Sequence, residues 1–296
     1  MDRSAVEVLP LLAHEDADWE RAERTVYVIR QSIRYRYPSP IHDLRQRLLL
    51  VPPGRHGDQH TLGWGLDASL AARRRQRQDR FGNTVVDLEV DTVETEIDFD
   101  AWCLIERRAT AELPRTRVNR SMAQPTPLTT ADRTLSEAAE ELAGTGAGGV
   151  ALAERICDWV HQRMVYRHDA TSIHTTAATA LALGAGVCQD YAHIALALCR
   201  HGGLAARYVS GHLLGEGGSH AWIEVLVADP DRPSVCRPVA LDPTHQRRAG
   251  LTYLTVATGR DYRDVAPVSG TYRASVQGHL SVRKQAALVS VFYRGD

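Results

Sequence analysis

A glycine-flanked apolar segment with one cysteine near its start constrains the fold of this chain most. Gly184 and Gly186 precede Cys188, good helix formers follow it, and a Gly-Gly pair stops the run after about His201. This pattern predicts a helix with Cys188 in its first turn that runs to about His201. The glycines are expected to permit positive φ and to leave room for a substrate close to the backbone.

Helical and strand patterns form separate blocks in the second half of the chain. Apolar residues recur at helical spacing from Thr134 and again from about Val150, and a short helix is expected over 177–183. Strand-like segments follow at 206–214, 220–227 and 235–241. Because the helices precede the strands, the order favours an α+β fold, with a helical part followed by an antiparallel sheet, over a doubly wound sheet.

The first half has the period-two alternation of half-buried strands, which predicts an antiparallel β domain. Strands are expected at 26–29, 33–37, 85–90 and 97–105, with a turn at 81–83. The predicted organisation has five parts: a loose leader at 1–20, the β-rich domain at 21–112, a linker at 113–133, the α+β core at 134–250 and C-terminal strands completing the fold at 251–296.

Composition limits the classes of protein and of partner. The 296 residues are 44% apolar with a formal net charge of -1, which gives no overall field for nucleic acid or an anionic membrane. Neither a long apolar run nor a secretory signal pattern is present, so a cytoplasmic location is expected. Five cysteines at wide, irregular spacing favour free thiols over disulfides or structural zinc.

Cys188 is the candidate nucleophile. A free thiol has a pKa of roughly 8.5, and a helix N-terminus with a nearby imidazolium lowers it. The N–H groups of the first turn, that of Cys188 among them, could also stabilise an oxyanion. The competing interpretation is a packed core residue. Cys199, about 16 Å further along the same helix, cannot share a site with Cys188 and is expected in the core.

His220 is the best-placed candidate base, because it begins a strand directly after a glycine-rich loop. His193 competes, but its position about 140° around the helix from Cys188 favours packing or solvent exposure. Asp242, at the end of an apolar strand, is the candidate carboxylate that orients the imidazole. Its alternative role is to begin a turn before Pro243. Asp190 lies so early in the helix that contact with the helix terminus is favoured.

With these segments in hand, residues 134–250 resemble the transglutaminase-like superfamily of papain-like folds. The resemblance rests on Gly186-Val187-Cys188-Gln189-Asp190-Tyr191-Ala192-His193, Tyr208-Val209-Ser210-Gly211, Ser219-His220-Ala221-Trp222-Ile223-Glu224-Val225 and Asp242-Pro243-Thr244. The first half resembles the β-rich N-terminal domain of bacterial members, and residues 259–267 resemble the segment after their core. A Gly-Trp that many relatives carry before Asp-Pro-Thr is replaced here by residues 237–241.

The resemblance implies a catalytic triad of Cys188, His220 and Asp242, with the cysteine on a helix and the other two on neighbouring strands. It also implies no metal and no organic cofactor. The expected activity is that of a cysteine protease or amidase, which hydrolyses peptide, isopeptide or amide bonds of a peptide or protein substrate through a thioester. Acyl transfer to an amine and a non-catalytic binding module are the alternatives. The substrate and the oligomeric state stay open.

Two further patterns are given less weight. Cys188, His193, Cys199 and His201 are close in sequence, but their helical positions spread them over roughly 20 Å, which argues against a metal site. The arginine-rich run at 73–80 is expected to be a solvated hairpin loop, because the overall charge is neutral and no aromatic residues are interleaved. No nucleic-acid or membrane partner is therefore expected.

Overall fold

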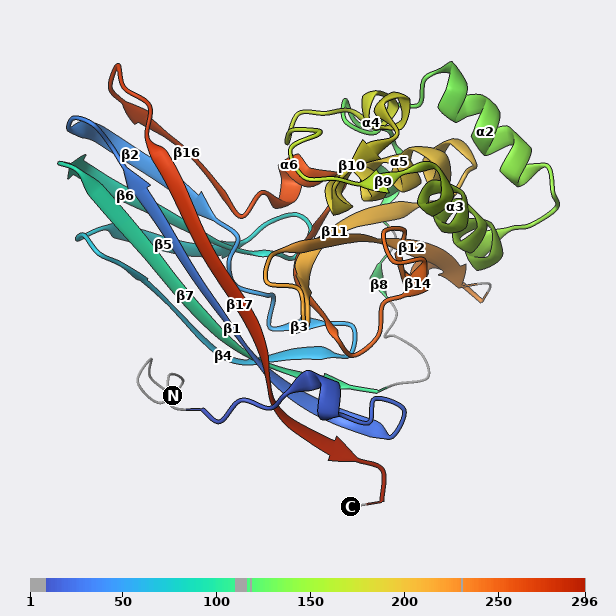
Figure 1. Ribbon diagram of the computed structural model, residues 1–296, viewed down its shortest axis with the longest axis horizontal. Coiled ribbons are helices and arrows are strands. Elements are labelled where there is room, and N and C mark those ends of the chain that lie inside the picture. Colours follow the sequence, from blue (N-terminus) through green and yellow to red (C-terminus); the bar gives the residue numbers. More distant parts are fainter. Residues whose placement is uncertain (1–8, 110–115, 118, 230, 296) are drawn as a thin grey trace.

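Two antiparallel sheets that share one apolar core form the N-terminal part of the molecule (Figure 1). The computed structural model describes residues 9–109, 116–117, 119–229 and 231–295. The five-stranded sheet has the order β17-β1-β7-β4-β3, with bounds His279–Tyr293, Ala22–Arg36, Glu96–Arg108, Gln59–Ala68 and Arg55–His56. The four-stranded sheet has the order β16-β2-β6-β5, with bounds Val268–Arg273, Ile41–Leu48, Thr84–Val93 and Arg73–Gln78.

Strand β1 joins two segments that were expected to be separate strands. The polar residues between them include Gln31, which is 5% exposed. Its side-chain amide donates a hydrogen bond of 3.0 Å to the carbonyl of Leu50. Because this buried polar group is satisfied, the strand continues through it to Arg36 without interruption.

The last strand of the chain returns to the first. Strand β17 pairs with β1 from Ala22 opposite Tyr293 to Arg36 opposite His279. The N-terminal sheets are therefore completed by residues that follow the helical part of the chain. The domain boundaries predicted from the sequence stay a prediction. The expected leader lies partly outside the described residues, and its described portion carries the short helix η1, His14–Asp16.

The second part of the molecule packs helices against a six-stranded sheet. The helices are α2 Arg133–Ala143, α3 Gly149–Arg163, α4 Ala177–Leu183 and α5 Cys188–His201. The sheet has the order β14-β13-β12-β11-β15, with bounds Arg247–Arg248, Arg232–Asp242, His220–Asp229, Ala206–Leu213 and Tyr253–Gly259, and β8, Thr116–Arg117, pairs with β13. Short elements complete it: η2 Arg120–Ala123, β9 Val165–Tyr166, β10 Ala185–Gly186 and α6 Tyr262–Val265.

Helix α5 is the centre of this second part. Every residue from Gln189 to Arg200 is buried, because the helix lies between the sheet and the other helices. Helix α2 buries Leu135, Ala138, Ala139 and Leu142, the positions whose spacing predicted it. The α+β prediction, with helices followed by an antiparallel sheet and preceded by a β region, is confirmed.

Side-chain amides join the two parts. Gln59 of β4 donates to the carbonyl of Thr255 at 2.7 Å and accepts from its N–H at 2.9 Å. Asn83 makes the same pair of bonds to Thr258, both 2.8 Å long. Both amides are buried. Each pairs with a backbone N–H and carbonyl of β15, as a residue of a neighbouring strand would.

Two expected loops contain regular structure. The arginine run forms the edge strand β5, with all six side chains exposed, and not a hairpin loop. The expected linker contains β8 and η2, while residues 113–115 and 118 lie outside the described part. Within the described residues, no helix is both long enough and apolar enough to span a membrane.

Candidate active site

Cys188 is the first residue of α5, directly after the N-cap Val187. Gly184 ends α4 with a positive φ of 61°, and its N–H bonds to the carbonyls of Ala180 and Leu181 at 3.1 and 3.0 Å. This left-handed residue turns the chain sharply into α5. The N–H of Cys188, at the first helical position, has no acceptor within the helix itself.

Gly186 is needed for a different reason from the one expected. A Cβ at this position would lie 2.4 Å from Oδ2 of Asp190. That carboxylate accepts hydrogen bonds from the N–H of Val187 at 2.8 Å and from the hydroxyl of Thr171 at 2.6 Å. Gly186 therefore makes room for the carboxylate that caps α5, and Asp190 lies at the helix terminus and not with the candidate triad.

His220 and Asp242 meet at neighbouring ends of two paired strands. His220 is the first residue of β12 and Asp242 is the last of β13. Nε2 of His220 lies 2.7 Å from Oδ2 of Asp242, and both side chains are buried. The Trp222 ring packs beside the imidazole, with 6.1 Å between the ring centroids. This packing keeps water from the histidine–carboxylate hydrogen bond.

The other side of the imidazole faces Cys188. Burial alone would lower the pKa of His220, but hydrogen bonds to Asp242 and to the Cys188 side chain raise it to about 10. Because Nε2 is bonded to Asp242, Nδ1 is the ring nitrogen available to the sulfur. The structure thus brings the three residues identified in the sequence into one constellation.

Asp242 is held in its ionised form by several donors. Oδ2 also accepts from the Tyr253 hydroxyl and from Nδ1 of His245, each at 2.8 Å. Oδ1 accepts from the backbone N–H of Thr244 at 2.8 Å and of His245 at 3.3 Å. Burial would raise the pKa of Asp242, yet the hydrogen bonds from His220 and His245 hold it well below its usual range.

Sequence reasoning missed several residues of this site. Glu216 lies in the glycine-rich loop before β12, with Oε2 3.3 Å from Nδ1 of His220 and Oε1 2.9 Å from Nε2 of His245. Tyr166 of β9 lies beside Cys188, where burial and the cysteine raise the pKa of Tyr166 to about 12. Of these, only His245 had a usable signal, since it lies three residues after Asp242.

Two other residues of α5, His193 and Cys199, have structural roles. His193 is 1% exposed, and its Nε2 accepts the N–H of Tyr262 at 3.2 Å. Burial lowers the pKa of His193 to about 3, so the ring is neutral. Cys199 is also buried. Among the residues that the structure describes, Cys188, His193, Cys199 and His201 form no ligand group, whereas Glu216, His220 and His245 do.

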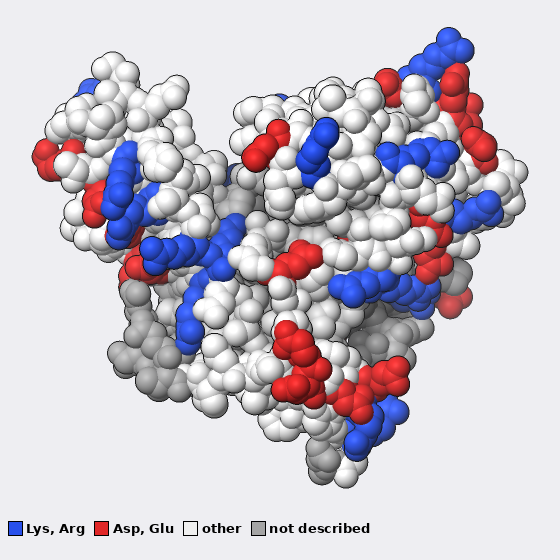
Figure 2. All heavy atoms as spheres, in the orientation of Figure 1, with Lys and Arg blue, Asp and Glu red and all other residues white. Residues whose placement is uncertain are grey.

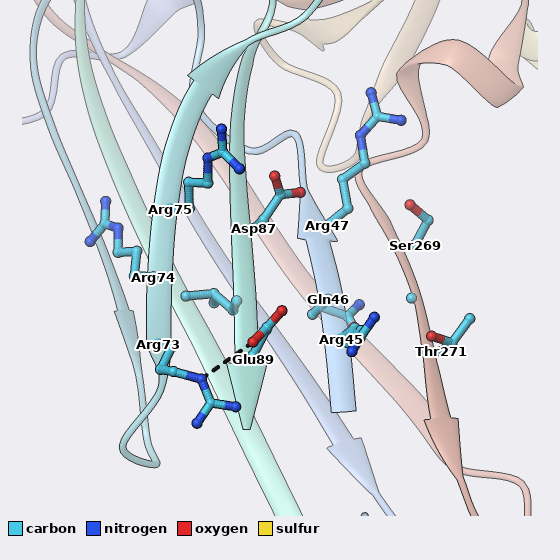
Figure 3. A pocket seen from close by; sticks show the side chains of 12 residues that line it. Arg45, Gln46, Arg47, Arg73, Arg74, Arg75, Asp87, Glu89, Ser269 and Thr271 are labelled. Carbon is cyan, nitrogen blue, oxygen red and sulfur yellow. Dashed lines mark hydrogen bonds and ion pairs between the residues drawn. The ribbon is translucent and has the colours of Figure 1, made fainter. Parts of the chain in front are cut away.

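The arginine run lines an open hollow of about 730 Å³ on the four-stranded sheet. Figure 2 shows basic side chains gathered over these strands with acidic ones between them. Arg73 pairs with Glu89 at 3.3 Å (Figure 3), and Arg74 donates to the carbonyl of Leu66 at 3.0 Å. The acidic residues Asp87 and Glu89 divide the surface, so it is not uniformly basic.

Comparison with known families covers both parts of the molecule. A model described as the transglutaminase-like superfamily matches residues 136–233. A model described as the bacterial transglutaminase-like N-terminal region matches residues 27–106.

Individual proteins are also similar to this chain in sequence or in structure. An uncharacterized protein of Mycobacterium tuberculosis is 38% identical over 130 residues, which is 40% of each chain. One of Mycobacterium leprae is 36% identical over 124 residues, 38% of this chain and 42% of that protein. These alignments therefore span less than half of either relative. A Cytophaga hutchinsonii protein, provisionally assigned as a cysteine protease, superposes with a TM-score of 0.74 at 20% identity, over 92% of this chain and 93% of that chain.

Proposed function

Because the chain combines both family regions and so belongs to the transglutaminase-like superfamily, we propose that it is a cysteine-dependent hydrolase. The enzyme hydrolyses peptide, isopeptide or amide bonds, and the reaction passes through a thioester. One observation carries the proposal: a buried His220–Asp242 pair at 2.7 Å beside a cysteine at a helix N-terminus. This arrangement supplies the nucleophile, the acid–base group and its orienting carboxylate.

In the acylation step, the Cys188 thiolate attacks the substrate carbonyl and a carbon–sulfur bond forms. The carbonyl oxygen becomes an oxyanion, for which the N–H of Cys188 is a donor. The carbon–nitrogen bond then breaks, and the amine leaves with the proton from Nδ1 of His220. Asp242 holds Nε2–H throughout, which fixes the ring tautomer and stabilises the imidazolium before that proton is transferred.

In the deacylation step, neutral His220 takes a proton from water as the water attacks the thioester. The carbon–sulfur bond breaks, the acid is released and the thiolate–imidazolium pair is restored. An amine in place of water would give acyl transfer, with the same steps up to the thioester. The partition of products between acid and amide, measured with increasing amine, distinguishes these two outcomes.

Replacement of Cys188 tests the nucleophile directly. We expect Cys188→Ala to lose at least about a thousandfold in turnover of a substrate that the native protein cleaves. Intact-protein mass spectrometry should detect an acyl adduct on the native protein and none on the variant. Cys103→Ala, which changes a buried cysteine of β7, is the matched control and should retain both the turnover and the acyl adduct. Undiminished turnover by Cys188→Ala would overturn the assignment of Cys188 as the nucleophile.

We also propose a cytoplasmic location. All five cysteines are free thiols, the state that a reducing compartment maintains. Fractionation of cells that express the full-length protein tests this location, and recovery in an extracytoplasmic fraction would contradict it.

A further inference from the structure

Two histidines of the site share one carboxylate oxygen. Oδ2 of Asp242 lies 2.7 Å from Nε2 of His220 and 2.8 Å from Nδ1 of His245. An ionised carboxylate only accepts hydrogen bonds, so the ring nitrogens that face it carry hydrogens. In the neutral rings, the opposite nitrogens are therefore bare lone pairs: Nδ1 of His220 and Nε2 of His245.

Both of these nitrogens face Glu216. Its carboxylate oxygens lie 3.3 Å from Nδ1 of His220 and 2.9 Å from Nε2 of His245. Lone pairs on nitrogen and carboxylate oxygen repel at these distances unless positive charge lies between them. Protons on the rings are one source of that charge, and a divalent cation is the other.

The donor set and its spacing suit zinc. The ligand atoms of Glu216, His220 and His245 all lie within 4.8 Å of one another. Zinc binds such atoms at about 2.0–2.2 Å in a tetrahedron, which places neighbouring ligand atoms about 3.4 Å apart. Two histidines and one glutamate form an established zinc ligand set, and a carboxylate behind each histidine is the usual way that such rings are oriented.

We propose that Glu216, His220 and His245 bind one zinc ion, which reversibly blocks the candidate active site. Once the ion displaces the ring protons, two neutral imidazoles with the carboxylates of Glu216 and Asp242 carry a charge of about -2, which the ion balances. Among the described residues, Cys188 is not a member of this ligand group, so the three residues leave a fourth coordination position open. Zinc binds Nδ1 of His220, the nitrogen that would otherwise serve Cys188.

The elements that carry the ligands allow the ion to enter. His220 is buried at the start of β12, whereas His245 lies exposed between β13 and β14. Glu216 is exposed in the loop that precedes β12. The site is therefore rigid on the His220 side and open to solvent on the His245 side. Zinc binding itself does not require hydrolysis, and only the inhibitory consequence rests on the proposed function.

The test is calorimetric titration of chelator-treated, full-length protein with zinc chloride. We expect one ion per chain, and at least about tenfold weaker binding for each of Glu216→Gln and His245→Gln. Exposed residues of the same types provide the matched controls Glu141→Gln and His174→Gln, which should bind as the native protein does. Absence of binding, or binding that neither ligand variant weakens, would overturn the site.

A second measurement separates this site from metal capture by the thiol alone. Zinc should slow the reaction of iodoacetamide with Cys188 in the native protein and not in His245→Gln. Binding that is lost in Cys188→Ala but kept in both ligand variants would assign the metal to the cysteine and reject the proposal. Stoichiometric zinc with no hydrolase activity would reject the proposed function and leave the zinc site standing.

Discussion

Asp242 links several groups of the candidate active site through its two carboxylate oxygens. One oxygen accepts hydrogen bonds from the rings of His220 and His245 and from the hydroxyl of Tyr253, and the other accepts from two backbone N–H groups. The same carboxylate therefore orients the candidate base and the exposed histidine of the proposed zinc site. Removal of this carboxylate should weaken both turnover and zinc binding, whereas removal of the Tyr253 hydroxyl should affect neither turnover nor zinc binding strongly.

Asp242→Asn tests the orienting role. The amide replaces one acceptor oxygen by a donor, so the hydrogen on Nε2 of His220 loses its fixed partner and the ring can adopt the wrong tautomer. We expect turnover to fall by about 10² to 10⁴ and the alkylation of Cys188 to slow with it. Tyr253→Phe removes a single hydrogen bond and should cost less than about tenfold. Equal losses in the two variants would contradict the assigned role.

His193 gives a prediction for stability. Its pKa is about 3 in the folded protein, because burial disfavours the charged ring. The unfolded chain, with an ordinary histidine pKa of about 6.5, binds this proton first. Stability is therefore fully present above pH 6.5 and falls as the pH drops toward 3, by up to about 1.4 kcal/mol per pH unit for one proton.

His193→Gln keeps an acceptor for the N–H of Tyr262 but cannot titrate. Urea unfolding at several pH values between about 4 and 7 should show a shallower decline of the unfolding free energy than in the native protein. His174→Gln, at an exposed position, should leave the slope unchanged. A slope that is the same in all three proteins would reject the buried neutral histidine.

At the scale of elements, the helices followed most directly from the sequence. Helix α4 has the expected bounds, and α5 has Cys188 in its first turn and ends at His201, as predicted, because glycines mark their ends and apolar spacing marks their buried faces. Strand β5 was missed because both of its faces are exposed and no alternation arises. Its stability depends on pairing with β6 and on cross-strand ion pairs such as Arg77 with Asp87 at 2.8 Å.

The junction before α5 provides the element-scale prediction. In Gly186→Ala, the new methyl group would lie 2.4 Å from the Asp190 carboxylate and push it from the N–H of Val187. We expect a loss of about 1–3 kcal/mol of stability and slower alkylation of Cys188, since the start of the helix moves. Gly54→Ala, where no atom lies within 4 Å of the added carbon, should stay within about 0.5 kcal/mol. Native behaviour of Gly186→Ala would show that the cap does not position the cysteine.

At the scale of the whole molecule, no local sequence pattern could predict which residues and strands far apart in the chain contact one another. His220 and Asp242 were identified because each lies at one end of a recognisable strand. Glu216 contacts His220 only after the glycine-rich loop folds back, and β17 joins β1 across nearly the full chain. Neither pairing has a periodic or spacing signal. The first and last strands enclose the helical part in sequence, so the two parts are expected to fold as one cooperative unit.

Gln59→Ala tests this coupling between the two parts. The substitution leaves the buried N–H and carbonyl of Thr255 without their partner, at about 1–3 kcal/mol for each unsatisfied group. If the parts unfold together, urea midpoints followed by far-ultraviolet circular dichroism, which reports the helices, and by tryptophan fluorescence should fall by the same amount. Gln76→Ala on the exposed strand β5 is the control and should shift neither midpoint. A Gln59→Ala protein in which the two transitions no longer coincide would show that the β-sheets and the helical part unfold independently.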